Sequence, residues 1–288
     1  MVHAGQVLKK IREERGFTQK QAVRGVCSSS LLSTFERGKD ENSSLTFDKL
    51  FGILKNLGVS SAEFEYVLNG YKSTPFFQLM DDAGKLFASG NHIALEQLLE
   101  EERKKIVTPH DKLTCLMLKN MLSEIDSKVT LSKDEKDQII NYLALMDYWG
   151  YYELTLYGNA MRVFDACAVK NLSNDMIARS AFYINILQNR SLVASALVNT
   201  VIVLIGYDEI ESALAFNQRL KELANRKDIF HKTLHLFNEG TLDFILGNKQ
   251  EGEQKMLNAI DVFKYTKCFD LVKVYHQNYE GIVEYYGK

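Results

Sequence analysis

The chain has 288 residues, of which 46% are hydrophobic, and a formal net charge of −2. A chain of this length is near the upper limit for a single hydrophobic core, which predicts more than one domain. The charged N-terminus is unlike a signal peptide, and no apolar run reaches the about 18 residues of a membrane helix, so we expect a cytoplasmic protein with no membrane partner.

The first 70 residues are weakly basic and predict five short helices. Residues 1–72 carry 11 Lys and Arg against eight Asp and Glu, whereas the rest of the chain carries 24 against 29. Thr18 and Ser28 can cap the second and third helices, and Gly16 and Gly38 are suited to end the first and third. Two short helices joined by a tight turn are typical of a helix-turn-helix. We expect the five helices at 5–15, from Thr18, from Ser28 to Gly38, at 46–57 and at 60–69.

The rest of the chain predicts a series of paired helices. The only two prolines, Pro75 and Pro109, fall where helices should begin. The first helices of successive pairs start at intervals of roughly 34–42 residues, as in tetratricopeptide and related repeats. Apolar residues recur at helical spacing over 75–88, 91–106, 109–125, 132–147, 151–166, 173–189, 191–205, 208–225, 228–246, 248–265 and 268–286. We therefore predict an all-α protein, with a helix-turn-helix domain over 1–70 and a right-handed α-superhelix of tetratricopeptide-like helix pairs over 71–288.

The residues around the second and third helices resemble a known DNA-binding domain. The runs "REERGFTQ", from Arg12 to Gln19, and "STFERGK", from Ser33 to Lys39, are similar to those of the lambda-repressor-like (Cro/cI, XRE) domains. The resemblance implies that the third helix enters the major groove, while Gln19 and the basic residues bind phosphates. The implied DNA-binding residues are Arg12, Arg15, Thr18, Gln19, Ser28, Ser29, Ser30, Ser33, Thr34, Arg37 and Lys39. A purely structural role, such as a local ion pair, is the alternative for each basic residue.

The whole chain resembles one family of regulators. Ala22-Val23 stands where lambda-repressor-like domains usually have Leu-Ala, and the turn before Ser28 is one residue shorter than their consensus. These departures, the stretch "SSSLLSTFERG", the chain length and the helical repeats are similar to the Rgg/GadR/MutR family of Gram-positive bacteria. The resemblance implies a transcriptional regulator that binds double-stranded promoter DNA and responds to a short hydrophobic pheromone peptide in quorum sensing.

A homodimer is expected from the geometry of DNA recognition. One helix-turn-helix covers one half-site, whereas a dimer binds two half-sites about one turn of DNA apart. The last predicted helix, 268–286, is expected to cap the repeats or to join two chains through Val274, Tyr275, Tyr279 and Ile282.

Polar side chains interrupt the apolar helices of the repeat region, and these are Asn159, Arg162, Asn185, Asn199 and Asn238. A buried amide needs a partner, because leaving it unpaired costs about 1–3 kcal/mol. The partner is either the carbonyl of a neighbouring helix or the backbone of an extended peptide. The family resemblance favours a bound peptide, with apolar walls provided by Phe182, Ile186, Val203 and Phe237.

Neither an enzyme, a cofactor nor a metal site is expected. The pair His231-x3-His235 has metal-like spacing but lacks the Glu of HExxH and an obvious third ligand. The four cysteines form no CxxC pair. Ser191 and Ser195 share a helical face, but the sequence shows no base beside them. The alternative to a peptide-controlled regulator is a helical-repeat regulator or interaction scaffold with no peptide ligand.

Overall fold

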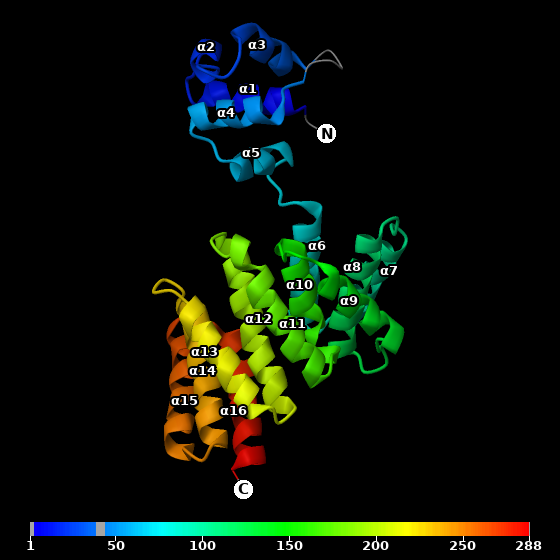
Figure 1. Cartoon of the computed structure of the whole chain (residues 1–288), viewed down its shortest axis with the longest axis vertical. Coiled ribbons are helices and arrows are strands. Elements are labelled where there is room, and N and C mark those ends of the chain that lie inside the picture. The colour runs from blue at the N-terminus through cyan, green and yellow to red at the C-terminus, as the bar shows by residue number, and fades with distance from the viewer. Residues whose placement is uncertain (1–2, 39–43, 288) are drawn as a thin grey trace. The chain divides into compact units, whose positions relative to one another are not determined.

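The computed structural model describes residues 3–38 and 44–287, and the chain divides into two compact units, Met1–Ser89 and Gly90–Lys288 (Figure 1). Every regular element within the described ranges is helical, which confirms the predicted all-α class. The predicted boundary at residue 70 precedes α6, whereas the first compact unit extends to its end. The first unit contains α1 (Ala4–Glu14), α2 (Gln19–Ala22), α3 (Ser29–Arg37), α4 (Phe47–Leu57), α5 (Ser61–Leu68) and α6 (Pro75–Ala88).

The first five helices share one hydrophobic core. Val7, Leu8 and Ile11 form the buried face of α1, and Leu32 and Phe35 form that of α3. Ile11 lies three and four residues after Leu8 and Val7, and Phe35 lies three after Leu32, so each set makes one apolar stripe. These stripes pack against side chains from the end of α2, from α4, from the turn after α4 and from α5, namely Ala22, Val23, Ile53, Leu54, Leu57, Val59 and Phe64.

Local capping sets the starts of α2 and α3, as predicted. The Thr18 hydroxyl accepts a hydrogen bond from the Gln21 backbone N at 3.3 Å, and the Gln21 side chain accepts one from the Thr18 backbone N at 2.8 Å. The Ser28 hydroxyl accepts a hydrogen bond from the Leu31 N at 3.2 Å. Gly38 then ends α3 with a φ of 59°, a left-handed conformation that glycine adopts without steric cost. The tight turn and the short helices are thus specified by residues close in sequence.

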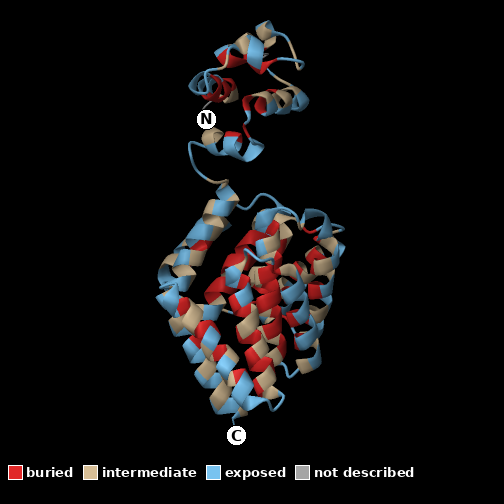
Figure 2. Ribbon diagram, turned by 90° about the vertical axis from the view of Figure 1, so that its left-hand side faces the viewer, coloured by how far each residue is buried: buried red, intermediate tan, exposed pale blue. Residues whose placement is uncertain are grey.

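The second unit is a stack of helices in which alternate helices touch. Helices α8, α10, α12, α14 and α16 each contact the next of the set, and together they form what we call the even-helix layer. Helices α13 and α15 pack between successive members of it, as expected for helical repeats. Buried residues concentrate where these helices face one another (Figure 2). The helices are α7 (His92–Arg103), α8 (Pro109–Ile125), α9 (Lys133–Leu145), α10 (Tyr151–Ala160), α11 (Ala166–Arg179), α12 (Leu187–Gly206), α13 (Ile210–Leu223), α14 (Ile229–Ile245), α15 (Lys249–Tyr265) and α16 (Phe269–Tyr286).

Two predicted helices, 151–166 and 173–189, have different bounds in the structure. Helix α10 ends at Ala160 and is followed by the 3₁₀ turn η1 (Met161–Val163). Helix α11 begins earlier than predicted because the Asp165 side chain caps it, accepting a hydrogen bond from the Ala168 N at 2.8 Å. It also ends ten residues before the predicted end, at Arg179, and a second 3₁₀ turn, η2 (Ala181–Tyr183), follows.

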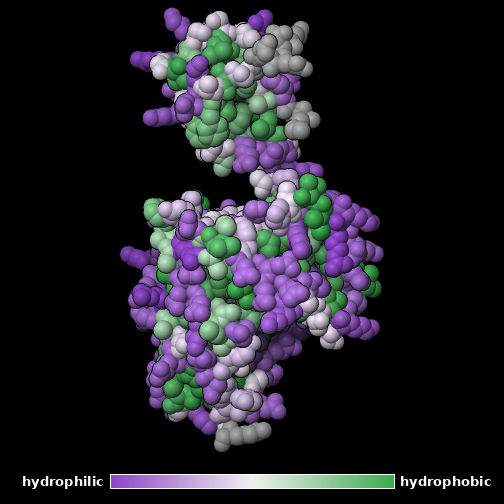
Figure 3. Space-filling view, turned by 45° about the vertical axis from the view of Figure 1, so that its right-hand side comes forward, coloured by the Kyte–Doolittle hydropathy of each residue, from purple (hydrophilic) through white to green (hydrophobic). Residues whose placement is uncertain are grey.

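Helix α12 is the central apolar helix of the second unit. Its length and composition also fit a membrane span, but 56% of its most apolar window is buried inside the protein. It packs against α10, α11, α13 and α14. On the face of the repeat unit drawn in Figure 3, hydrophilic side chains cover most of the surface. The apolar character of α12 is therefore that of a core helix.

Candidate functional site

Helix α3, the predicted recognition helix, has one buried apolar face and one face rich in hydroxyl groups. Leu32 and Phe35 are buried, whereas Ser30 is exposed. The Ser30 hydroxyl lies 3.0 Å from that of Ser28, which caps the helix. The other residues of α3 that were predicted to bind DNA are half-buried or exposed, and the half-buried ones are Ser29, Ser33 and Thr34.

Arg12, which was predicted to bind a phosphate, is buried in the first unit. Its Nε lies 2.6 Å from Glu36 Oε1, and its Nη2 lies 2.8 Å from Glu36 Oε2. Its Nη1 donates to the Phe17 carbonyl at 2.8 Å. Arg12 is 7% exposed and Glu36 is 3% exposed, and the hydrogen bonds with Glu36 raise the pKa of Arg12 above its usual value. Arg12 therefore holds α1 to α3, and its buried guanidinium fits the structural alternative to a phosphate contact.

Arg15 is also engaged within the protein. Its Nη1 donates to the carbonyls of Leu57 and Gly58 at 3.0 and 2.9 Å, and its Nη2 lies 3.7 Å from a Glu63 carboxylate oxygen. Arginine at the C-terminus of a helix satisfies carbonyls that have no partner within the helix. Arg15 thus contacts the end of α4, while its side chain stays exposed at the surface of the first unit, and its phosphate contact stays a prediction.

Gln19 is held at the start of α2 by the same buried carboxylate. Its Nε2 donates to Glu36 Oε2 at 2.7 Å, which fixes the direction of the amide. Thr18 beside it is exposed and forms the cap described above. The Arg12–Glu36 pair therefore orients the residue that the family resemblance assigns to a phosphate.

Arg37, Lys20 and Arg24 are the exposed cations around α2 and α3. Arg37 donates to the Thr34 hydroxyl at 3.2 Å, on the hydroxyl-rich face of α3. Lys20 and Arg24 lie on α2 and in the turn after it, and sequence reasoning overlooked both. The two cations stand four residues apart in and just after the predicted second helix, a signal that was available in the sequence. Lys39 lies outside the described residues.

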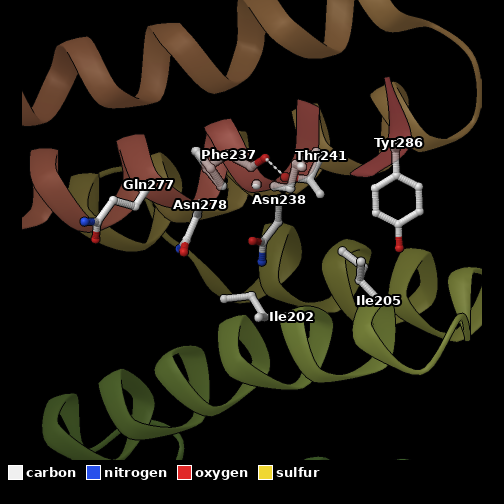
Figure 4. Close-up of a pocket in the computed structure, with 10 residues that line it drawn as sticks. Ile202, Ile205, Phe237, Asn238, Thr241, Gln277, Asn278 and Tyr286 are labelled. Atoms are coloured by element: carbon white, nitrogen blue, oxygen red, sulfur yellow. Dashed lines mark hydrogen bonds between the residues drawn. The ribbon is translucent and has the colours of Figure 1, made fainter. Parts of the chain in front are cut away.

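A pocket of about 310 Å³ lies within the even-helix layer, between α12, α14 and α16. Its walls are mainly apolar and include Ile202 and Ile205 of α12, Phe237 of α14 and Tyr286 of α16. The Asn238 amide points from α14 toward Ile202, across the space between the helices (Figure 4). A mainly apolar concavity with a few polar groups is the usual form of a ligand site.

Of the predicted amides, Asn238 is the one that is buried and lines this pocket. It is 2% exposed, and its Nδ2 has no hydrogen-bond partner among the described residues. Asn199 lies one turn before Ile202 on the same face of α12 and is half-buried. Phe237, one of the predicted apolar walls, also lines the pocket.

Asn159 and Arg162 belong to a second polar group, where α8 meets α10. The Asn159 amide donates to the Thr155 carbonyl at 2.8 Å, so its partner is a helix carbonyl. Arg162 Nη1 lies 3.1 Å from a Glu124 carboxylate oxygen. Asn120 donates to the Asn159 carbonyl at 2.6 Å. Asn120 and Glu124 were not predicted as site residues, although their spacing of four residues places them on one side of α8.

Asn185 lies outside these polar groups. It was predicted within a helix, but it follows η2 in an exposed segment, and its Oδ1 accepts a hydrogen bond from Arg190 at 3.2 Å. Phe182 and Ile186, predicted as apolar walls, are 77% and 52% exposed on the same segment. These three residues do not line the pocket between α12, α14 and α16.

His231 supplies a base beside Ser195 that the sequence did not reveal. Its Nε2 lies 3.0 Å from the Ser195 hydroxyl, and its Nδ1 lies 2.8 Å from an Asp228 carboxylate oxygen. The order Ser195–His231–Asp228 resembles a hydrolase triad. However, Ser195 lies inside α12, where the backbone N–H groups are hydrogen-bonded within the helix and form no oxyanion hole. The same Asp228 also caps α14 through the His231 N at 3.2 Å. This chain of hydrogen bonds ties α12 to α14.

The two units have the architecture of a helix-turn-helix transcriptional regulator with a helical-repeat unit. The C-terminal domain of the HTH-type transcriptional regulator Rgg matches residues 95–277, and the chain belongs to this family.

Three solved structures resemble the chain over almost its whole length. The Streptococcus dysgalactiae SHP pheromone receptor Rgg2 is 25% identical, with a TM-score of 0.83 over 97% of this chain and 100% of that chain. A candidate transcriptional regulator from Listeria monocytogenes is 21% identical, with a TM-score of 0.86 over 98% and 97%. Bacillus thuringiensis PlcR, solved in complex with the peptide PapR7 and DNA, is 19% identical, with a TM-score of 0.66 over 98% and 99%.

Proposed function

We propose that this protein is a cytoplasmic transcriptional regulator that binds promoter DNA as a homodimer and is controlled by a short hydrophobic peptide in quorum sensing. Relatives of the same architecture support both partners: Rgg2 is named as a pheromone receptor, and PlcR was solved with a peptide and DNA. In this chain, α3 presents its hydroxyl groups to DNA, with Lys20, Arg24 and Arg37 as the nearby cations.

The observation that carries the peptide proposal is the unpartnered Asn238 amide inside an apolar pocket. An unpaired buried amide disfavours the free protein, whereas the backbone carbonyl of an extended peptide would satisfy it. Ile202, Ile205 and Phe237 would then surround the apolar side chains of the peptide. A ligand shifts a conformational equilibrium only by the difference in its affinity for the two states, so the peptide must favour one arrangement of the dimer.

Asn238→Ala is expected to weaken peptide binding by about tenfold, because the peptide loses one buried hydrogen bond. Short hydrophobic peptides encoded near the gene would be screened by fluorescence polarisation. Asn217→Ala is the matched control, since Asn217 is also buried with an unpartnered amide atom but does not line the pocket. Equal losses in both variants would remove Asn238 from the site. Failure of every peptide to bind would favour a regulator or scaffold with no peptide ligand.

Arg37→Ala is expected to weaken binding to DNA of any sequence and to reduce the salt slope of the affinity by about one unit. Arg15→Ala should leave the slope unchanged, because the Arg15 guanidinium is bound to the end of α4. Gel shifts at several salt concentrations, with DNA from upstream of the gene, would measure both variants. If Arg15→Ala reduced the salt slope of DNA affinity and Arg37→Ala did not, the proposed orientation of α3 on the DNA would be wrong.

The dimer is proposed to form through exposed apolar side chains of α16. Tyr275, which was expected to cap the repeats or to join two chains, is buried within the repeat unit against Phe237 at a ring distance of 4.8 Å. Phe269, Val274 and Tyr285 are the large exposed hydrophobics on this helix. Val274→Glu should therefore shift the protein from dimer to monomer in sedimentation at micromolar concentration. Phe47→Glu, at an exposed position of the first unit, should not. A wild-type monomer in the presence of DNA would contradict the proposal.

A further inference from the structure

A second pocket, of about 280 Å³, lies where α11, α12 and α13 meet. Its walls are formed by Ile177 of α11, Val193 and Leu197 of α12, and Leu223 of α13. Since an apolar cavity of about 150 Å³ holds one benzene, this pocket has room for a molecule of roughly ten non-hydrogen atoms. It shares helix α12 with the Asn238 pocket, but the two pockets have no lining residue in common.

The second pocket contains a buried hydroxyl group without a partner. Ser180, at the C-terminal cap of α11, lines the pocket and is 1% exposed. Its Oγ makes no hydrogen bond within the described residues. Buried polar side-chain atoms in native proteins nearly always have a partner, so an ordered water or a ligand group is expected beside this hydroxyl. A serine hydroxyl can both donate and accept, and it therefore suits a ligand with one small polar group.

The charges at this pocket cancel. Arg219 and Glu222 are the charged residues that line it, and Arg219 Nη1 lies 3.2 Å from a Glu222 carboxylate oxygen. A paired arginine and glutamate select neither an anion nor a cation. The chemistry of the site thus favours a neutral molecule.

The segment after Ser180 extends the apolar surface of this pocket. Ala181 and Ile184 line the pocket. Phe182 and Leu187, on the same segment, are each 77% exposed but do not line the pocket, and the Phe182 ring packs against the Tyr148 ring at 5.1 Å. The contribution of this segment to the pocket is therefore that of Ala181 and Ile184.

We propose that the pocket between α11, α12 and α13 binds a small, neutral, mainly apolar molecule whose single hydroxyl group pairs with Ser180. The hydrocarbon part lies against Val193, Leu197 and Leu223. The proposal is independent of the peptide proposal, because it concerns different residues and a different class of ligand.

1-Heptanol is the probe, added to the full-length protein and followed by isothermal titration calorimetry. Saturable binding is expected, and sodium heptanoate should bind more weakly because it adds a charge. Ala181→Leu should abolish binding, since the larger side chain fills the pocket from an exposed position and leaves folding unchanged. Ser180→Ala should weaken it by roughly three- to tenfold, the range for one net hydrogen bond. Asn238→Ala should bind 1-heptanol like the wild type.

Fluorescence of Trp149 gives a second readout that does not depend on a variant. Trp149 is the single tryptophan of the chain, and its backbone N donates to the carbonyl of Arg179, the residue before Ser180, at 3.1 Å. A change in its emission on adding 1-heptanol is expected. The absence of saturable binding would overturn the proposal, as would binding that Ala181→Leu leaves intact. Binding lost in Asn238→Ala and kept in Ala181→Leu would place the alcohol in the other pocket and equally overturn it.

Discussion

Arg12→Ala is expected to destabilise the helix-turn-helix unit by about 3–5 kcal/mol, the usual cost of removing one partner from a buried ion pair. The Glu36 carboxylate, 3% exposed, would keep only the Gln19 amide as a side-chain partner. The Phe17 carbonyl would also lose its guanidinium donor. We therefore expect α1, α3 and the loop before α2 to lose their mutual contact.

The loss would be measured on the full-length protein, by hydrogen exchange of amides in the first unit and by DNA binding. Arg15→Ala is the matched control, because Arg15 is an arginine of the same helix end with a largely exposed ion pair. Exposed ion pairs contribute about 0–1 kcal/mol, and the Arg15 bonds to the Leu57 and Gly58 carbonyls are part-buried or exposed rather than buried, so the control should lose less stability than Arg12→Ala. Equal protection of the first-unit amides in both variants would show that the buried pair is not needed for the fold.

Gly252→Ala is expected to destabilise the repeat unit by about 1–3 kcal/mol through overpacking. Helices α14 and α15 cross so closely that a Cβ on Gly252 would lie 2.5 Å from the Gly240 carbonyl oxygen. It would also lie 2.5 Å from the Phe244 backbone N. Backbone atoms cannot rotate away as a flexible side chain can, so the two helices must move apart.

Thermal or denaturant unfolding followed by Trp149 fluorescence would report on the repeat unit. Gly158→Ala, in α10 of the same unit, is the control, because a Cβ at Gly158 meets no atom within 4 Å. Alanine is favoured over glycine inside a helix by about 1 kcal/mol, so this variant should be unchanged or more stable. A Gly252→Ala protein as stable as the Gly158→Ala protein would contradict the close crossing. The Asn238 pocket lies on α14, so peptide affinity should fall with the same variant.

The sequence predicted well those features that depend on residues near one another in the chain. Thr18 and Ser28 were identified as caps because a cap bonds a backbone N–H only two or three residues away. Periodic apolar residues predicted α12 and α14 to within a few residues, since one helix face is buried at a fixed spacing. The cap of α11 at Asp165 was overlooked because the apolar pattern continued past it.

The sequence by itself determined the all-α architecture, the helix-turn-helix and the family, since each rests on local spacing or on contiguous motifs. Only the tertiary structure decided which polar residues are free to act. Arg12 and Arg37 look alike in the sequence, yet the first faces Glu36 across 24 residues of chain, and the second is exposed. Asn238 and Asn185 are both amides in apolar surroundings, but one lines a pocket and the other accepts a hydrogen bond from Arg190 in an exposed segment. Such differences depend on contacts between distant segments, which the packing of helices creates and local periodicity does not encode.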